Sequence, residues 1–185
     1  GGCTAAQSSS IAIGDGTLKH ASYGSSGAII NLALGQDAGT AITTGSSNVL
    51  IGHQAGNAFV DDSGNTAVGY QSLLLSTGQD NTAIGAYAAD ELGAGIDNTA
   101  VGYAALASAD NEEAYNTAVG KRALGKLDVN DGDHNTALGY NAGAYLSNGS
   151  TQLTDIRSCT YIGSSTAGSA ATGVENETVI GYAAV

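Results

Sequence analysis

Asn98-Thr99-Ala100-Val101-Gly102 is one copy of the five-residue motif that decides the fold of this 185-residue chain. The motif is an Asn in most copies, a Thr or aliphatic residue, a mostly small residue, a branched aliphatic residue and a Gly. It recurs ten times, and the copies end at Gly14, Gly35, Gly52, Gly69, Gly85, Gly102, Gly120, Gly139, Gly163 and Gly181. Successive motif glycines are 16 to 24 residues apart, which is too short for a helix pair or a propeller blade but suits one turn of a β-solenoid. The sequence therefore predicts an all-β, parallel β-solenoid of about ten coils that forms a single domain over residues 1–185.

The motif has the pattern of a strand that is apolar on both faces. Neighbouring side chains of a strand point to opposite faces, so Thr99 and Val101 share one face and Ala100 takes the other. Both faces need cover, whereas a coil of about 17 residues encloses only one thin interior. We therefore expect the second face to meet other copies of the chain, with the small middle column, including Ala100 and Ala118, at a close interface. The alternative is a wider monomeric solenoid whose interior covers both faces.

Columns outside the strand have their own chemistry. The third residue after each motif glycine is small in every copy, which indicates a close approach, and the fourth never carries a charge, so we expect it to face inward. The first accepts Asp15, Lys121 and other polar residues, as a solvated position does. The Asn column has two structural interpretations, because Asn tolerates the left-handed backbone of a tight turn and stacked Asn side chains form ladders. Both interpretations give Asn a scaffold role.

The run Asn65-Thr66-Ala67-Val68-Gly69-Tyr70, with Ser72-Leu73 following, resembles the head repeats of trimeric autotransporter adhesins and the related repeats of bacteriophage tail fibres. The resemblance extends from Ser10 to Val185. Those repeats form left-handed parallel β-rolls that associate as trimers and bind host cells or matrix. The resemblance thus implies a left-handed β-roll, a homotrimer, and a structural and host-receptor-binding segment of a tail fibre in the virion. The alternative it leaves open is the head domain of a trimeric adhesin on the bacterial cell surface.

Composition agrees with an extracellular or virion structural piece. The chain has 28 Gly and no Pro, as expected for tight bends and for a ladder that uses every backbone donor. Its net charge of −12 argues against nucleic acid or an anionic membrane surface as a partner, and no apolar run is long enough to insert into a bilayer. Cys3 and Cys159 belong to opposite ends of the stack, too far apart for an intrachain disulfide.

Recognition is expected in the acidic return segments and on exposed tyrosines, because loops on a rigid scaffold carry recognition. The partner would be a cell-surface glycan or protein receptor, and the tyrosines would stack on sugar rings. The candidate ligand-binding residues are Asp110, Glu112, Glu113, Asp128, Asp131, Asp133, His134, Tyr70, Tyr103 and Tyr140. The alternative is that the acids only keep the repeat soluble and block pairing between fibres.

One acidic segment is a candidate metal site. Asp128, Asn130, Asp131 and Asp133 offer oxygen ligands at the short spacings that Ca²⁺ accepts. The spacing does not match an EF-hand loop or the nonapeptide of calcium-binding β-rolls, so a solvated turn without any cofactor is the alternative.

Catalysis has little support in the sequence. His20, His53 and His134 lie in different coils with no Ser or Cys nucleophile at a recognisable spacing. Paired acids such as Asp90-Glu91 would be needed for glycan cleavage, and adjacent acids on a strand point apart, so we expect a non-enzymatic protein. A further alternative is an ice-binding β-solenoid, because seven motif threonines from Thr66 to Thr178 would align in one column. The same column holds Ile11 and Val49, which favours a core or a partner there.

Overall fold

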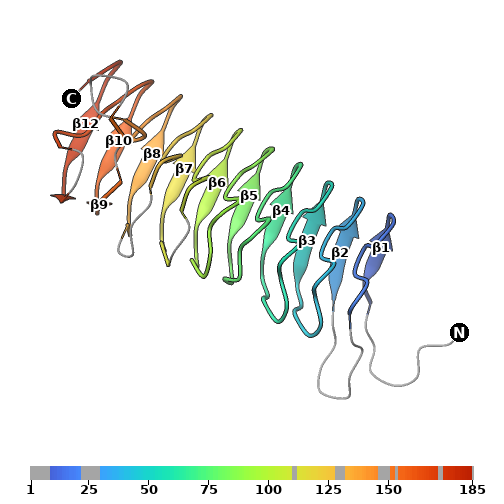
Figure 1. The fold of residues 1–185 in the computed structure, drawn as a ribbon. Coiled ribbons are helices and arrows are strands. Elements are labelled where there is room, and N and C mark those ends of the chain that lie inside the picture. The colour runs from blue at the N-terminus through green and yellow to red at the C-terminus, as the bar shows by residue number, and fades with distance from the viewer. Residues whose placement is uncertain are drawn as a thin grey trace, which may run out of the picture.

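The computed structural model describes residues 9–21, 30–109, 112–127, 132–145, 151–152, 154–170 and 173–184. Within these residues the chain is all-β, and its coils stack into the elongated rod of Figure 1. The strands are β1 (Ile11–Ile13), β2 (Asn31–Leu34), β3 (Asn48–Ile51), β4 (Thr66–Val68), β5 (Thr82–Ile84), β6 (Thr99–Val101), β7 (Thr117–Val119), β8 (Thr136–Leu138), β9 (Ile156–Arg157), β10 (Thr160–Ile162), β11 (Val174–Glu175) and β12 (Thr178–Ile180).

The motif strands form one parallel sheet. Its ten strands run in the order β1 to β8, then β10 and β12, while β9 and β11 pair in a second parallel sheet. Each motif pairs with the same motif of the next coil, so that Thr82 lies beside Thr99, Ala83 beside Ala100 and Ile84 beside Val101. Like residues therefore stack in straight columns along the rod. The predicted parallel β-solenoid is confirmed, with about eight turns.

The middle motif residue points into the coil. Ala83, Ala100 and Ala118 are fully buried within one chain, so the small column packs against the interior of its own coil. The expectation that this column lies at an interface between copies was wrong. The fourth residue after the motif glycine faces the interior, as predicted, and the small third residue lies there too, since Ala105 and Leu106 are both fully buried.

A large residue in the middle column is compensated by a glycine in the fourth column after the motif glycine. Where the middle residue is Leu50, the facing fourth residues are Gly39 and Gly56, and a Cβ on either glycine would stand 2.7 Å from a Leu50 methyl group. Tyr161 is likewise met by Gly143, where a Cβ would stand 2.8 Å from the tyrosine ring. Most coils with Ala in the middle column carry Leu or Ala in the fourth, and the two that carry Gly there, Gly39 and Gly143, each lie one coil before a large middle residue, Leu50 or Tyr161. The close-packed interior therefore compensates a large middle residue with a glycine in the fourth column.

Ala100→Leu is expected to destabilise each chain by ~1–3 kcal/mol, because it overpacks a level already filled by Leu106. The second substitution Leu106→Gly should restore part of the loss, since it copies the pairing of Leu50 with Gly56. Thermal melting followed by circular dichroism measures both. The control is Ala94→Leu, which makes the same change at an exposed position. An Ala100→Leu protein that melts at the wild-type temperature would contradict this packing.

The bend after each strand is made by residues with positive φ at the same positions of each repeat. Gly102 has φ of 134°, and a Cβ there would stand 2.6 Å from the carbonyl oxygen of Gly120, so only glycine fits. The second and fourth residues after it, Ala104 and Leu106, have φ of 51° and 52°. Residues other than glycine seldom adopt this region, and its recurrence in most coils shows that the tight bend imposes it.

The Asn column is a buried ladder, so the ladder interpretation is confirmed. The side-chain oxygen of Asn98 accepts a hydrogen bond from the backbone N–H of Asn116 at 3.0 Å, and its side-chain amide donates to the carbonyl of Glu113 at 2.7 Å. The same exchange is repeated from Asn31 to Asn135. The left-handed turn falls on the residue before Asn, as at Asp97 with φ of 56°, so the turn interpretation was wrong.

The second and fourth motif residues point away from the interior and form the outward strand face. Its branched-aliphatic column is exposed at several levels, with 42% of Ile84 and 49% of Leu138 accessible. Beside it runs the threonine column, in which Thr66, Thr82 and Thr99 are half-buried. Water reaches this face in a single chain, so the prediction that a solenoid encloses only one strand face is confirmed.

Candidate functional site

An aromatic row runs along the bend that follows the motif glycines. His53 stacks on Tyr70 with ring centroids 5.3 Å apart, Tyr70 meets Tyr87 edge-on at 5.2 Å, and Tyr87 meets Tyr103 edge-on at 5.8 Å. The Lys121 ammonium lies 5.5 Å from the centre of the Tyr103 ring, within reach of a cation–π interaction. Stacked coils bring these residues together because each sits one or two positions after its glycine.

The row includes two of the three predicted tyrosines. Tyr70 and Tyr103 are 45% and 46% exposed, and Tyr87 joins them. Sequence reasoning missed Tyr87 because it is the second residue after its glycine, outside the column of the other tyrosines, and yet its ring meets those of Tyr70 and Tyr103. Tyr140 is 48% exposed, and no ring contact places it in the row.

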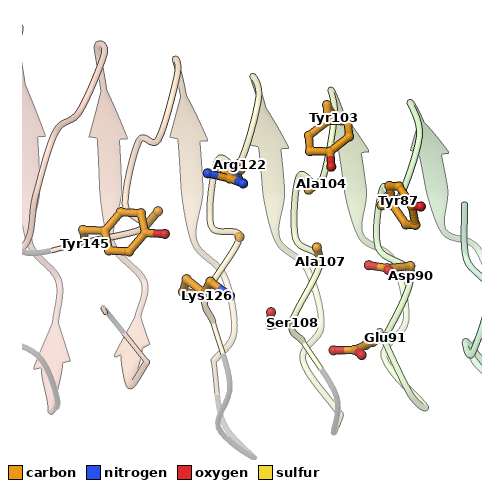
Figure 2. Close-up of a pocket in the computed structure, with 12 residues that line it drawn as sticks. Tyr87, Asp90, Glu91, Tyr103, Ala104, Ala107, Ser108, Arg122, Lys126 and Tyr145 are labelled. Carbon is orange, nitrogen blue, oxygen red and sulfur yellow. The ribbon is translucent and has the colours of Figure 1, made fainter. Parts of the chain in front are cut away.

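A hollow of about 450 Å³ opens beside the end of this row. We call it the bend groove, and Figure 2 shows its lining residues. They are Tyr87, Asp90, Glu91, Tyr103, Ala104, Ala107, Ser108, Arg122, Gly125, Lys126, Ala144 and Tyr145.

Small residues on one coil create the bend groove. Ala104 is the second residue after its motif glycine, a place that holds Tyr87 on the preceding coil and Arg122 on the following one. Ala107 corresponds in the same way to Asp90. The coil of β6 is therefore low between Tyr87 and Arg122 at the first place (Figure 2), and at the second place it is low beside Asp90, while the following coil holds Gly125 there. The two walls are two coils apart, or about 10 Å at the usual strand spacing.

The two walls carry opposite charge. Asp90 and Glu91 line one side, and Arg122 and Lys126 line the other. In the part of the chain that the structure describes, neither of these cations lies within ion-pair distance of a carboxylate. The Oδ1 atom of Asp90 is buried without a hydrogen-bond partner. Burial first, and the Glu91 charge second, raise the pKa of Asp90 to about 6, against a smaller lowering by Lys126.

Asp90→Asn is expected to raise stability at pH 7.5, by no more than about 1 kcal/mol, because Asp90 is only partly buried and solvent screens its charge. Its pKa is 3.8 in the unfolded chain and about 6 in the fold. The fold therefore holds the Asp90 proton more tightly, and stability falls as pH rises from about 4 to 6 and stays lower above that window.

Melting of both proteins at pH 4 and pH 7.5 measures this effect. The gain should be seen at pH 7.5 and be nearly absent at pH 4. Asp97→Asn is the control, since it removes one carboxylate at an exposed position. A lower melting temperature for Asp90→Asn than for the wild type at pH 7.5 would show that the charged form is stabilising.

The predicted loop residues are not gathered at this groove. Asp110, Asp128 and Asp131 lie outside the described residues, as does Asn130. Glu112 is exposed, whereas Glu113 is fully buried, which removes its carboxylate from the surface where a receptor would bind. His134 stacks on Tyr115 with ring centroids 4.9 Å apart. These residues lead into the next motif strand, whereas the aromatic row follows it.

Asp133 has a structural role. One of its carboxylate oxygens accepts a hydrogen bond from the backbone N–H of Ala114 on the preceding coil, at 2.7 Å. Among the described residues no three His, Cys, Asp or Glu side chains lie close enough together to hold a metal ion. The Ca²⁺ hypothesis thus depends on three residues outside the described ranges and remains untested.

The return segment that contains Asp133 also contributes to the core. Leu127 is fully buried, and the carbonyl of Gly132 accepts the side-chain amide of Asn116. Leu127, Gly132 and Asp133 therefore contribute to the scaffold.

Family models, curated proteins and solved structures were each compared with the chain, and none matches it. No described residue belongs to a helix that is long and apolar enough to span a bilayer. The interpretation of function therefore depends on the repeat motif, the outward strand face and the bend groove.

Proposed function

We propose that this chain is a non-enzymatic structural and host-receptor-binding segment of a phage tail fibre. In this proposal all ten motif copies form coils of one left-handed solenoid, and three solenoids associate in parallel as a homotrimer in the virion. The observation that carries the proposal is the outward strand face, an apolar surface along the ten-strand sheet that a single chain leaves uncovered.

The outward strand face is what a symmetric fibre needs. An uncovered row of branched aliphatic side chains such as Ile84 and Leu138 is unfavourable in water. Each chain has one such face along its length, so three chains around a common long axis cover all three faces with the same contacts. A closed trimer also leaves the bend of each chain outside, where the aromatic row and the bend groove remain accessible to a cell-surface glycan or protein receptor.

The alternative is that this segment belongs to the head of a trimeric adhesin on a bacterial surface, which would have the same geometry. The full reading frame distinguishes the two, because a membrane-anchor β-barrel downstream indicates an autotransporter and a self-cleaved chaperone domain indicates a phage fibre.

Ice binding is a second candidate, and the orientation of the threonine column favours it. Thr66, Thr82 and Thr99 lie in register on the outward side of a regular sheet, as on ice-binding solenoids. The two candidates compete for one face, because a trimer buries the threonines that ice would need. A thermal-hysteresis measurement on the purified protein tests this candidate.

Two measurements test the main proposal. Sedimentation equilibrium at micromolar concentration should give three times the chain mass of 18.1 kDa, and a monomer would refute the assembly. Fluorescently labelled protein should adsorb saturably to at least one of a panel of bacterial strains and be displaced by unlabelled protein. A trimer that adsorbs to none of them would refute the receptor-binding part.

A further inference from the structure

The bend groove has the features of a ligand site for a specific class of sugar. We propose that it binds a sugar carrying a carboxylate, such as a sialic or uronic acid within a surface glycan. The proposal depends on the receptor-binding function above and adds the class of ligand, the place where it binds and the residues that select it.

The first argument is charge. The chain has five Lys and Arg residues against seventeen acids, yet three of the five, Lys121, Arg122 and Lys126, fall within six residues of the sequence. Arg122 and Lys126 face the groove and have no carboxylate partner among the described residues. Two cations without an ion pair among the described residues provide a place for an anion, and a guanidinium binds a carboxylate through two parallel hydrogen bonds.

The second argument is the mixture of aromatic and acidic groups around the cations. Tyr87 and Tyr103 lie at one end of the groove (Figure 2), and their rings offer apolar surface for the C–H face of a sugar. Asp90 and Glu91 on the opposite wall are acceptors for sugar hydroxyl groups. A simple anion such as phosphate would not use the rings or the acids.

The third argument is size. A volume of about 450 Å³ lies in the range of small-molecule sites. A folded protein partner would instead need a contact surface of about 800 Å² on this chain. Walls about 10 Å apart admit one or two sugar units, with the remainder of a glycan extending along the aromatic row. A glycan therefore fits the groove better than a folded protein does.

The test uses two pairs of probes: 3′-sialyllactose against lactose, which lacks the sialic acid unit, and digalacturonic acid against digalactose, which carries CH₂OH in place of each carboxylate. Isothermal titration to the wild-type protein should show at least a tenfold preference for an acidic probe over its neutral partner, since one charge-assisted bidentate contact contributes about 1.4 kcal/mol or more. No binding of either acidic probe, or equal binding of acidic and neutral probes, would overturn the proposal.

Three variants locate the binding. Arg122→Gln should weaken the acidic probe at least tenfold, and Ala104→Tyr should abolish binding by filling the hollow. The aligned positions on both neighbouring coils already hold Tyr87 and Arg122 at left-handed φ, so a tyrosine at position 104 is compatible with the fold. Lys19→Gln removes an exposed cation on the first coil and should leave binding unchanged. An Ala104→Tyr protein that is folded and binds the acidic probe as well as wild type would exclude the groove.

Cell adsorption separates this proposal from the broader one. If Ala104→Tyr and wild-type trimers adsorb equally well, the groove is not the receptor site but the receptor-binding function stands. If the wild-type trimer adsorbs to no strain and yet binds the acidic probe, the groove is a sugar site and the proposed function fails.

Discussion

Asn98→Ala is expected to lower the free energy of unfolding by about 3 kcal/mol per chain. The substitution removes the acceptor of the Asn116 backbone N–H and the donor to the Glu113 carbonyl. Asn98 itself is 2% exposed, so water cannot replace the lost side chain. A buried polar group left without a partner costs ~1–3 kcal/mol, and two such groups are left here.

Urea unfolding at a fixed protein concentration measures this loss. The matched control is Asn57→Ala, since Asn57 is a partly exposed Asn whose amide donates to the Asp37 carbonyl outside the ladder. Its loss should be below about 1 kcal/mol. If the two substitutions cost the same, the ladder contributes no more than an ordinary surface hydrogen bond.

The chain provides a natural intermediate for the same experiment. Cys159 occupies the Asn position of its coil, where its backbone N–H donates to Asn135 and its thiol donates to the Val174 carbonyl at 3.5 Å. Asn98→Cys should therefore fall between wild type and Asn98→Ala, because a thiol is a weak donor and a weak acceptor. A cost equal to that of Asn98→Ala would mean that the thiol does not replace the amide.

The columns of the fold could be predicted from sequence because a solenoid repeats its geometry. Parallel pairing in register places Thr82 beside Thr99 and Ala83 beside Ala100. Residues that occupy the same position in the aligned repeats therefore lie next to one another in the structure. Which strand face is interior could not be predicted from apolarity alone, since both faces are apolar. The pairing of Leu50 with Gly39 and Gly56 was the available signal, because such compensation arises between side chains that share one interior.

The candidate site was harder to predict, because it depends on a departure from the repeat. The bend groove exists where Ala104 replaces the larger Tyr87 and Arg122 of the neighbouring coils and where Ala107 and Gly125 follow Asp90, so the sequence signal is a run of small residues in two columns. The loop acids were chosen by charge instead, yet Glu113 is buried and Asp133 accepts a backbone hydrogen bond. Composition cannot distinguish a solvated carboxylate from one that satisfies the backbone of the next coil.

Glutamate on the outward strand face is expected to convert the proposed trimer into folded monomers. In the double variant Ile84→Glu with Val101→Glu, each chain places two carboxylates on the face that would meet its neighbours. A threefold assembly would bring six such charges together, and like charges at an interface cost several kcal/mol. We expect the association constant to fall at least about a thousandfold.

The coil itself should tolerate the double substitution. Ile84 is 42% exposed and Val101 is half-buried, and both side chains point away from the interior column of Ala83 and Ala100. Circular dichroism should therefore stay close to that of wild type while sedimentation equilibrium changes from trimer to monomer. The matched control is Gln36→Glu with Gln79→Glu, which adds the same two charges at exposed positions away from the outward strand face.

The control should remain trimeric, because it changes the net charge from −12 to −14 without touching the outward face. A double variant that also remains trimeric would show that this face is not the interface and would remove the observation on which the fibre proposal depends. A wild-type protein that is monomeric and shows thermal hysteresis, lost in the glutamate variant, would assign the face to ice instead. Because the face is one continuous surface, assembly and ice binding cannot both use it, and the same two substitutions separate them.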